Sequence, residues 1–245
     1  MSLFIKLSEY NCIGNDIEIV GDKFHHLAHV KRVKVGDEVS VSPDQSSKLH
    51  LGVISDITDT SILVKIIKTT DTNTYTDTKL TLGMCIIKGE KMDLVIQKAT
   101  EVGIDRIIPL ISKRTVVKLD NKNTQNKLTR YSKIAGSAAE QSERTTVPII
   151  DSPVSLPQLL TDVDNGTLIL FFYERNGQKI KDIKDKVSSF SDVLLLIGPE
   201  GGWDEAESDM IMKCGAIPVS LGDNILRAET AAIVASFTIK NLQSI

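Results

Sequence analysis

Two glycine-bearing segments near the end of the chain have the residue types that a small-molecule site needs. The first is Gly198-Pro-Glu-Gly-Gly202, and the second is Gly222-Asp-Asn-Ile-Leu-Arg227. Each segment follows an apolar run that is typical of a buried strand and precedes a run with helical periodicity. Loops at the carboxyl ends of parallel strands bind ligands in open α/β folds. We therefore expect the two loops to form one site.

The first loop would let a ligand approach the backbone closely. Its glycines have no side chains, and their amide groups are available as hydrogen-bond donors. The spacing matches neither the phosphate-binding P-loop nor the dinucleotide fingerprint. Taken alone, this loop is more typical of a tight structural turn than of a binding site.

The second loop adds charge to the expected site. Arg227 stands beside the predicted start of a helix, where anions are favoured. Glu229 supplies a carboxylate that would hold the arginine or stabilise a cation. Ile225 and Leu226 are apolar in a loop, which is expected if they line a pocket for a flat heterocycle. The alternative is that they pack back onto the sheet.

The elements that must position these loops fall into two patterns along the 245 residues. Residues 1–70 contain short alternating runs and one helix over 22–34, which is typical of a small β-barrel. The threonine-rich residues 71–78 predict a linker. From residue 79 to residue 245, strands alternate with helices, and the strands are apolar almost throughout, as parallel strands covered on both faces are. The predicted strands are 80–87, 106–111, 167–172, 193–197 and 217–221, and the predicted helices are 91–102, 124–143, 204–214 and 229–242. We expect the last helix to bury Ile233 and Phe237.

Composition excludes several classes of protein. No apolar run approaches the roughly 18–20 residues that span a bilayer. The three cysteines are far apart and form no CxxC pair, so we expect neither a disulfide framework nor a metal site, and a reducing, cytoplasmic location. Lys79 to Arg144 holds nine Lys and four Arg against seven acidic residues, although the chain as a whole carries −3. A phosphate-facing surface would explain this basic stretch, and so would a solvated helix surface.

Two motifs carry a family resemblance. The segments Ile197-Gly-Pro-Glu-Gly-Gly-Trp-Asp-Glu-Ala-Glu207 and Leu221-Gly-Asp-Asn-Ile-Leu-Arg-Ala-Glu-Thr-Ala231 closely resemble the RsmE family. These enzymes are ribosomal RNA uridine-N3 methyltransferases of the SPOUT class. The similarity also covers 88–103, 113–114 and 138–148, together with His25-His26-Leu27, Arg32 and Gly36-Asp37. It therefore extends over nearly the whole chain.

The resemblance implies a fold, a cofactor and partners. The implied fold is α/β, with a PUA-like β-barrel for RNA binding followed by a SPOUT domain with a C-terminal trefoil knot. The implied cofactor is S-adenosylmethionine, held in the loops of the knot. The implied partners are ribosomal RNA or the small ribosomal subunit and a second copy of the chain in a homodimer.

The implied reaction is methylation of N3 of a specific uridine in 16S ribosomal RNA. Arg227 is the candidate for stabilising the uracil anion, and Glu229 or Glu200 would position it or relay the N3 proton. The expected cofactor-binding residues are Phe171, Phe172, Ile197, Gly198, Pro199, Glu200, Gly201, Gly202, Ser220, Leu221, Gly222, Ile225, Leu226 and Arg227. The expected RNA-binding residues are His25, Lys31, Arg32, Lys88, Arg114, Arg130, Gln141 and Arg144.

Two other readings of the sequence stay open. A SPOUT enzyme could methylate a different RNA atom, such as a ribose hydroxyl or another base nitrogen. A non-catalytic RNA-binding module could retain the same fold. The intact segments 198–202 and 227–229 argue against the module, because a chain without catalysis needs neither.

Overall fold

A computed structural model describes residues 3–7, 10–43, 48–71, 78–116, 121–173 and 177–242. The chain divides into two compact units, Met1–Tyr75 with Ala139–Thr146, and Thr76–Ala138 with Val147–Ile245. Ala139–Thr146 thus belongs to the first unit, although it lies within the range 79–245 that the sequence pattern predicts as the second domain. Most of the expected linker, residues 72–77, lies outside the described residues.

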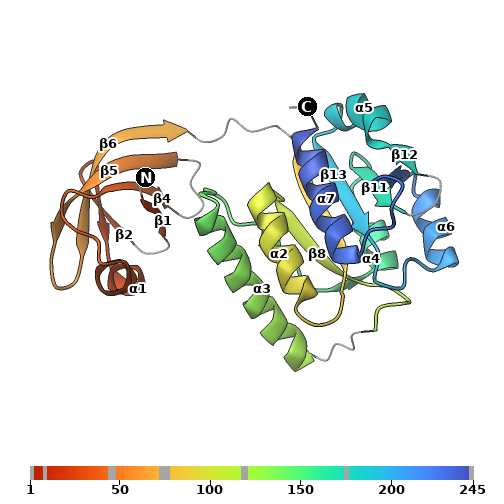
Figure 1. Ribbon diagram of the computed structural model, residues 1–245, viewed down its shortest axis with the longest axis horizontal. Coiled ribbons are helices and arrows are strands. Elements are labelled where there is room, and N and C mark those ends of the chain that lie inside the picture. The colour runs from red at the N-terminus through yellow and green to blue at the C-terminus, as the bar shows by residue number, and fades with distance from the viewer. Residues whose placement is uncertain are drawn as a thin grey trace. The chain divides into compact units, whose positions relative to one another are not determined.

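The first unit is built on a six-stranded, curled sheet (Figure 1). Its strand order is β1-β4-β5-β6-β3-β2, and among the described strands the β1–β4 pair is parallel and the other pairs are antiparallel. The strands are β1 (Leu3–Leu7), β2 (Tyr10–Ile13), β3 (Asp16–Ile19), β4 (Glu38–Pro43), β5 (Lys48–Ile57) and β6 (Ile62–Asp71). Side chains alternate between the two faces of each strand, and the inward set, which includes Ile5, Val41 and Val64, forms the core of this unit.

The helix of the first unit is shorter than the sequence predicts. α1 covers Gly21–His25 and continues as a π-helical turn over His26–Lys31. It ends at Arg32, whose φ of 54° is left-handed and cannot continue a right-handed helix. Phe24 and Leu27 lie on the inner side of this helix and are buried in the core.

Two contacts explain why Ala139–Thr146 belongs to the first unit. The Lys6 ammonium donates a hydrogen bond to the carbonyl of Thr145 at 2.5 Å. Lys23 forms an ion pair with Glu140 at 2.7 Å. Glu140 is near the end of α3 (Asn121–Gln141), so the last turn of that helix belongs to the first unit and its earlier turns to the second.

The second unit is built on a parallel sheet. The strand order is β10-β8-β7-β13-β11-β14-β12, with β9 beside β8, and every pairing between its described strands is parallel. The strands are β7 (Lys79–Cys85), β8 (Arg106–Ile111), β9 (Ile149–Ile150), β10 (Val154–Ser155), β11 (Leu168–Phe172), β12 (Gln178–Lys179), β13 (Asp192–Ile197) and β14 (Ile217–Ser220). Parallel strands need helical crossovers, and the alternation of strands and helices in the sequence reflects this requirement.

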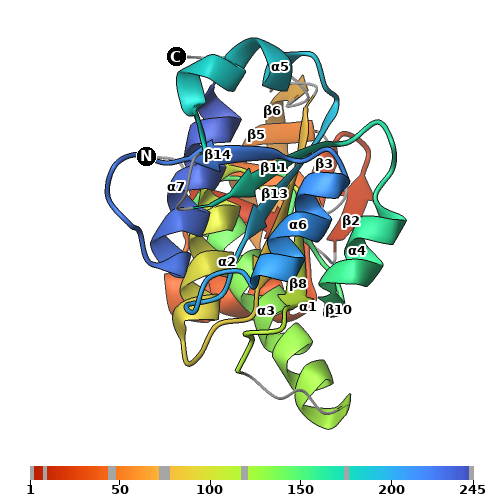
Figure 2. The same ribbon diagram turned by 90° about the vertical axis from the view of Figure 1, so that its right-hand side faces the viewer.

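Helices cover both faces of this sheet (Figure 2). α2 (Lys91–Val102), α3 and α7 (Ala228–Asn241) pack on one face, and α4 (Leu156–Asp162) and α6 (Glu205–Lys213) pack on the other. A 3-10 turn (Ile180–Ile183) leads into α5 (Lys184–Ser188). Along β11 and residues 193–197 of β13, successive side chains alternate between the two cores, so all of these residues are apolar.

One packing prediction for the last helix was wrong. Phe237 is 52% exposed, because α7 turns its small residues Ala232, Ala235 and Ser236 toward the sheet. Ile233 is half-buried.

The trefoil knot stays a prediction, since strand order alone does not establish threading. Within the described ranges, no helix is long and apolar enough to cross a membrane.

Candidate functional site

A cavity of about 480 Å³ lies in the second unit where the strands end. Its walls come from the loop after β13, the loop between β14 and α7, the last residues of β11 and the first residue of α2. The carboxyl ends of parallel strands meet at this edge of the sheet, and that is why segments distant in sequence share one cavity. The volume is in the range of small-molecule pockets.

The expected cofactor-binding residues line this cavity with one exception. Phe171 is buried on the opposite face of the sheet, where its ring stacks on Tyr173 at 5.1 Å between centroids and lies 5.8 Å from Trp203. Phe172 lines the cavity, whereas the Phe171 side chain packs in the opposite core against Tyr173 and Trp203 and is not part of the lining. The interpretation of Phe171 as a wall of the pocket was therefore wrong.

The cavity also contains residues that the sequence analysis did not assign to it. They are Lys91, Tyr173, Trp203, Val219, Ala228, Glu229 (expected only as a catalytic residue) and Ala231, whereas Asp223 and Asn224 belong to the second glycine loop, which was expected to form the site. The sequence contained a signal that could have placed Lys91 in the site. Lys91 begins a predicted helix just after a predicted parallel strand, and the two glycine loops also follow predicted parallel strands. Trp203 is buried, with 5% of its surface exposed, and it also lines the cavity.

The glycine loop after β13 is shaped by its close neighbours. A side chain on Gly198 would meet the Trp203 indole, with the nearest atom 2.9 Å from the position of a Cβ. Gly202 has a left-handed φ of 68°, and its N–H donates to the Pro199 carbonyl at 2.9 Å. Asp204 then caps α6 through a capping box with Glu207. These contacts account for glycine at both ends of the loop.

Two other loops are hydrogen-bonded to this glycine loop. The N–H of Lys88, after β7, donates to the Glu200 carboxylate at 3.0 Å. Arg114, after β8, donates from Nη1 to the Gly201 carbonyl at 2.9 Å. Lys113 forms an ion pair with Asp204 at 3.0 Å, and its hydrogen bond is the main reason that the Asp204 pKa is lowered.

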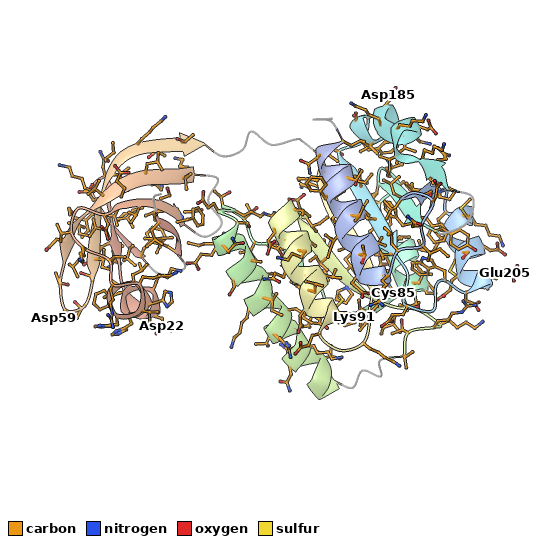
Figure 3. The ribbon with its side chains drawn as sticks, viewed as in Figure 1. Asp22, Asp59, Cys85, Lys91, Asp185 and Glu205 are labelled. Carbon is orange, nitrogen blue, oxygen red and sulfur yellow. The ribbon has the colours of Figure 1, made fainter. Side chains whose placement is uncertain are left out.

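The charged wall of the cavity is formed by Lys91, Arg227 and Glu229. Lys91, at the start of α2 (Figure 3), lies 3.2 Å from Oε1 of Glu229. Glu229 is 8% exposed, and its Oε2 has no hydrogen-bond partner among the described residues. Burial raises the pKa of Glu229, but its own backbone N–H, Lys91 and Arg227 lower it by more, so its pKa lies below the ordinary value. The carboxylate is therefore charged at neutral pH.

The three expected catalytic residues line the cavity but differ in surroundings. Arg227 is the N-cap residue of α7 and is exposed. Glu229 lies two residues later in the first turn, where a negative charge is favoured by the helix dipole. Glu200 is exposed, and its carboxylate accepts the Lys88 N–H, so it connects two loops.

The expected RNA-binding residues are divided between the two units. His25, Lys31, Arg32, Gln141 and Arg144 lie in the first unit, and Lys88, Arg114 and Arg130 lie in the second. The His25 ring stacks on His29 at 5.8 Å. Arg130 is hydrogen-bonded to Asp93, and Arg114 to Gly201. Their contact with RNA stays a prediction.

No group of three or more His, Cys, Asp or Glu in the described part of the chain is placed to hold a metal ion. The three cysteines are unpaired, and Cys85, at the end of β7 (Figure 3), is buried. Burial raises the Cys85 pKa to about 12.

Comparison with known proteins agrees with this architecture. A family model described as an RNA methyltransferase domain matches residues 74–240, and one described as an RNA methyltransferase PUA domain matches 19–67. Ribosomal RNA small subunit methyltransferase E of Rickettsia conorii is 35% identical over 235 residues, covering 94% of this chain and 92% of its own.

Two solved structures are similar over nearly their full length. A methyltransferase of Legionella pneumophila in complex with the bound cofactor SAM is 30% identical, with a TM-score of 0.83 and coverage of 100% of this chain and 98% of its own. Ribosomal RNA small subunit methyltransferase E of Neisseria gonorrhoeae, bound to S-adenosyl methionine, is 28% identical, with a TM-score of 0.85 and coverage of 99% and 98%. The resemblance noted in the sequence and the expected α/β fold with a PUA-like first domain are thereby confirmed. This chain belongs to the ribosomal RNA small subunit methyltransferase E family.

Proposed function

We propose that this chain transfers a methyl group from S-adenosylmethionine to N3 of a uridine in 16S ribosomal RNA. The observation that carries the proposal is the cavity, in which two glycine loops stand beside the charged wall of Lys91, Arg227 and Glu229. Membership of the family and the names of the relatives support ribosomal RNA as the substrate. The SAM-bound structures from Legionella and Neisseria support the cofactor.

The residues of the cavity fit S-adenosylmethionine. Phe172, Ile197 and Leu226 provide apolar walls for a flat ring, and exposed backbone of the glycine loops provides polar contacts. The buried Oε2 of Glu229 has no donor among the residues that the structure describes. An unpaired buried acceptor costs roughly 1–3 kcal/mol, so a donor from the ligand would be stabilising there. The proposed cofactor site consists of the expected residues without Phe171. When bound, the cofactor supplies a methyl group on a positively charged sulfur.

The charged wall suits the chemistry at a uracil. N3 of uracil carries a proton and becomes nucleophilic when that proton leaves, and the negative charge then spreads onto the two ring oxygens. Arg227, exposed at the mouth of the cavity, would stabilise this charge. Glu229 is a weak base because its pKa is lowered, so its charge would hold Lys91, 3.2 Å away, and favour the nearby Arg227 instead of taking the N3 proton. Glu200 would keep the glycine loop in place through Lys88.

Substitution of Arg227 tests this role. We expect Arg227→Ala to reduce turnover by about 10²–10³-fold, as loss of one anion-stabilising group does. The affinity of the Arg227→Ala variant for S-adenosylmethionine, measured by calorimetry, should stay close to that of the wild type. Arg227→Lys, which keeps the charge, should recover part of the turnover. Turnover that survives in Arg227→Ala would refute the assignment.

Mapping of the modified nucleoside tests the reaction itself. We expect 3-methyluridine to be missing from 16S ribosomal RNA of a strain lacking the gene, and to return with the wild-type chain but not with Arg227→Ala. A different missing methylation, such as one on a ribose hydroxyl, would assign the enzyme to another atom. Adding the purified chain to free RNA and to small subunits would show which is the substrate.

A homodimer in the cytoplasm is part of the same proposal. Val234 and Phe237 lie one turn apart on α7 and are 36% and 52% exposed, and Ile225 in the preceding loop is 83% exposed. Burial of these apolar side chains against a second copy would be favourable. A monomeric mass in sedimentation of the purified chain would contradict the dimer.

A further inference from the structure

The peptide between Gly201 and Gly202 is held from both sides. Its carbonyl oxygen accepts a hydrogen bond from Arg114 Nη1 at 2.9 Å, and its N–H donates to the Pro199 carbonyl at 2.9 Å. In a trans peptide these two groups point in opposite directions, so the two contacts together fix the orientation of the plane. Both flanking residues are glycine and tolerate other orientations at little steric cost. Arg114 is therefore the side chain on which the shape of this part of the cavity depends.

The same arginine has capacity for a second partner. Its side chain is 48% exposed, and its other contact, to Asp204, is long at 3.8 Å. A guanidinium has five N–H groups, and guanidinium and phosphate form strong, often bidentate pairs. The Lys113 ammonium lies 3.0 Å from the Asp204 carboxylate, nearer than the Arg114 guanidinium does, so Lys113 is the main ion-pair partner of Asp204. The outer side of Arg114 is consequently suited to a phosphate while its inner N–H stays on Gly201.

We propose that Arg114 is a positioning residue that couples RNA binding to cofactor binding. The guanidinium that orients the Gly201–Gly202 peptide also binds a phosphate of the RNA. This second contact restricts the motion of the guanidinium and therefore of the peptide to which it is hydrogen-bonded. The inference rests on the proposed function, because it requires both ligands. Coupling between two sites is reciprocal, so RNA raises the affinity for the cofactor by the same factor as the cofactor raises the affinity for RNA.

The test measures S-adenosylmethionine affinity by calorimetry, with and without a saturating 16S ribosomal RNA transcript. For the wild type, we expect the RNA to lower the cofactor Kd by about fivefold or more, as typical coupling energies give. Arg114→Ala should raise the Kd without RNA by about tenfold, as loss of a hydrogen bond from a charged donor does, and should remove the effect of RNA. Arg114→Lys, which keeps a charged donor, should restore part of both properties.

Kinetics and a matched control separate positioning from general damage. In Arg114→Ala, KM for the cofactor should rise far more than kcat falls, because saturating cofactor reorders the loop. Arg106→Ala removes an arginine of similar exposure (52%) from the start of β8, the strand that precedes Arg114, where it is paired with Asp151 at 2.5 Å. It should leave the cofactor Kd and the effect of RNA unchanged.

Distinct results would overturn the coupling and the proposed function. A wild-type cofactor Kd in Arg114→Ala, an effect of RNA that persists in that variant, or no effect of RNA on the wild type would each overturn the coupling. If Arg114→Ala does not fold, Arg114→Lys provides the test. An Arg114→Lys variant that binds the cofactor with wild-type affinity but shows no effect of RNA would also overturn the coupling, because the hydrogen bond to Gly201 would then be independent of RNA. A wild-type chain that binds no S-adenosylmethionine would instead refute the proposed function.

Discussion

Substitution of Gly198 by alanine perturbs the contact on which the glycine loop is built. The backbone of Gly198 is outside the left-handed region, so alanine meets no conformational barrier there. The added Cβ would lie 2.9 Å from Nε1, 3.0 Å from Cδ1 and 3.1 Å from Cε2 of Trp203. These separations are shorter than ordinary van der Waals contacts, so either the indole or the loop must move.

The cost of this movement follows from the surroundings of Trp203. The indole is 5% exposed and lies 5.8 Å from the Phe171 ring, so it cannot move outward without opening the core. Overpacking of this kind costs about 1–3 kcal/mol of unfolding free energy. For a protein of this size each kcal/mol lowers the melting temperature by about 2–4 °C, so we expect a decrease of roughly 2–12 °C. A displaced loop would also weaken S-adenosylmethionine binding.

A double-mutant cycle identifies the contact as the cause. Thermal unfolding is measured for Gly198→Ala, for Trp203→Phe, which removes the crowded indole atoms, and for the two combined. We expect the combined loss to be smaller than the sum of the single losses. Losses that add within about 0.5 kcal/mol would refute the steric explanation. Gly136→Ala is the matched control, because a Cβ there meets nothing within 4 Å and alanine favours helix by about 0.5–1 kcal/mol.

Two further predictions concern ionisable groups. The lowered pKa of Glu229 means that its charge stabilises the fold above the ordinary value near 4.5 and that this stability is lost as pH falls through the lowered pKa. In Lys91→Met the ammonium that opposes the effect of burial is absent, so the Glu229 pKa should rise. The decrease of kcat/KM in acid and the acid unfolding of the protein should then both occur at higher pH. If neither moves, the ion pair of Lys91 with Glu229 is contradicted. Cys12 and Cys214 are exposed, whereas burial raises the Cys85 pKa to about 12, so a thiol reagent should modify two thiols quickly and the third only on unfolding. Rapid modification of all three would contradict the burial of Cys85.

The positions of strands and helices in the second unit were largely predictable. The runs 193–197 and 167–172 are apolar because both faces of β13 and β11 are buried, and such runs are visible in a sequence. Asp204 and Glu207 have the spacing of a capping box, and the structure contains it. Short elements such as β9, β12 and α5 were not predicted, because two to five residues carry no measurable periodicity.

Side-chain placement was predictable only where a local rule governs it. The choice between Phe171 and Phe172 depends on which face of β11 meets the cavity, and a fully apolar strand has no alternation that reveals it. Phe237 was placed in the core by its helical spacing, but the spacing of α7 also allows a core of small residues. In both cases the partner surface decided the outcome.

The sequence by itself determined the family, the two glycine loops as one site and most residues of the cavity, because motif residues and apolar strands are local properties of the chain. Only the tertiary structure brought Lys91 to Glu229, Lys88 to Glu200 and Arg114 to Gly201. Each of these pairs joins residues that are 87 or more positions apart in the sequence. They meet because parallel strands place successive loops at one edge of the sheet, and this order of strands is not encoded in any local pattern.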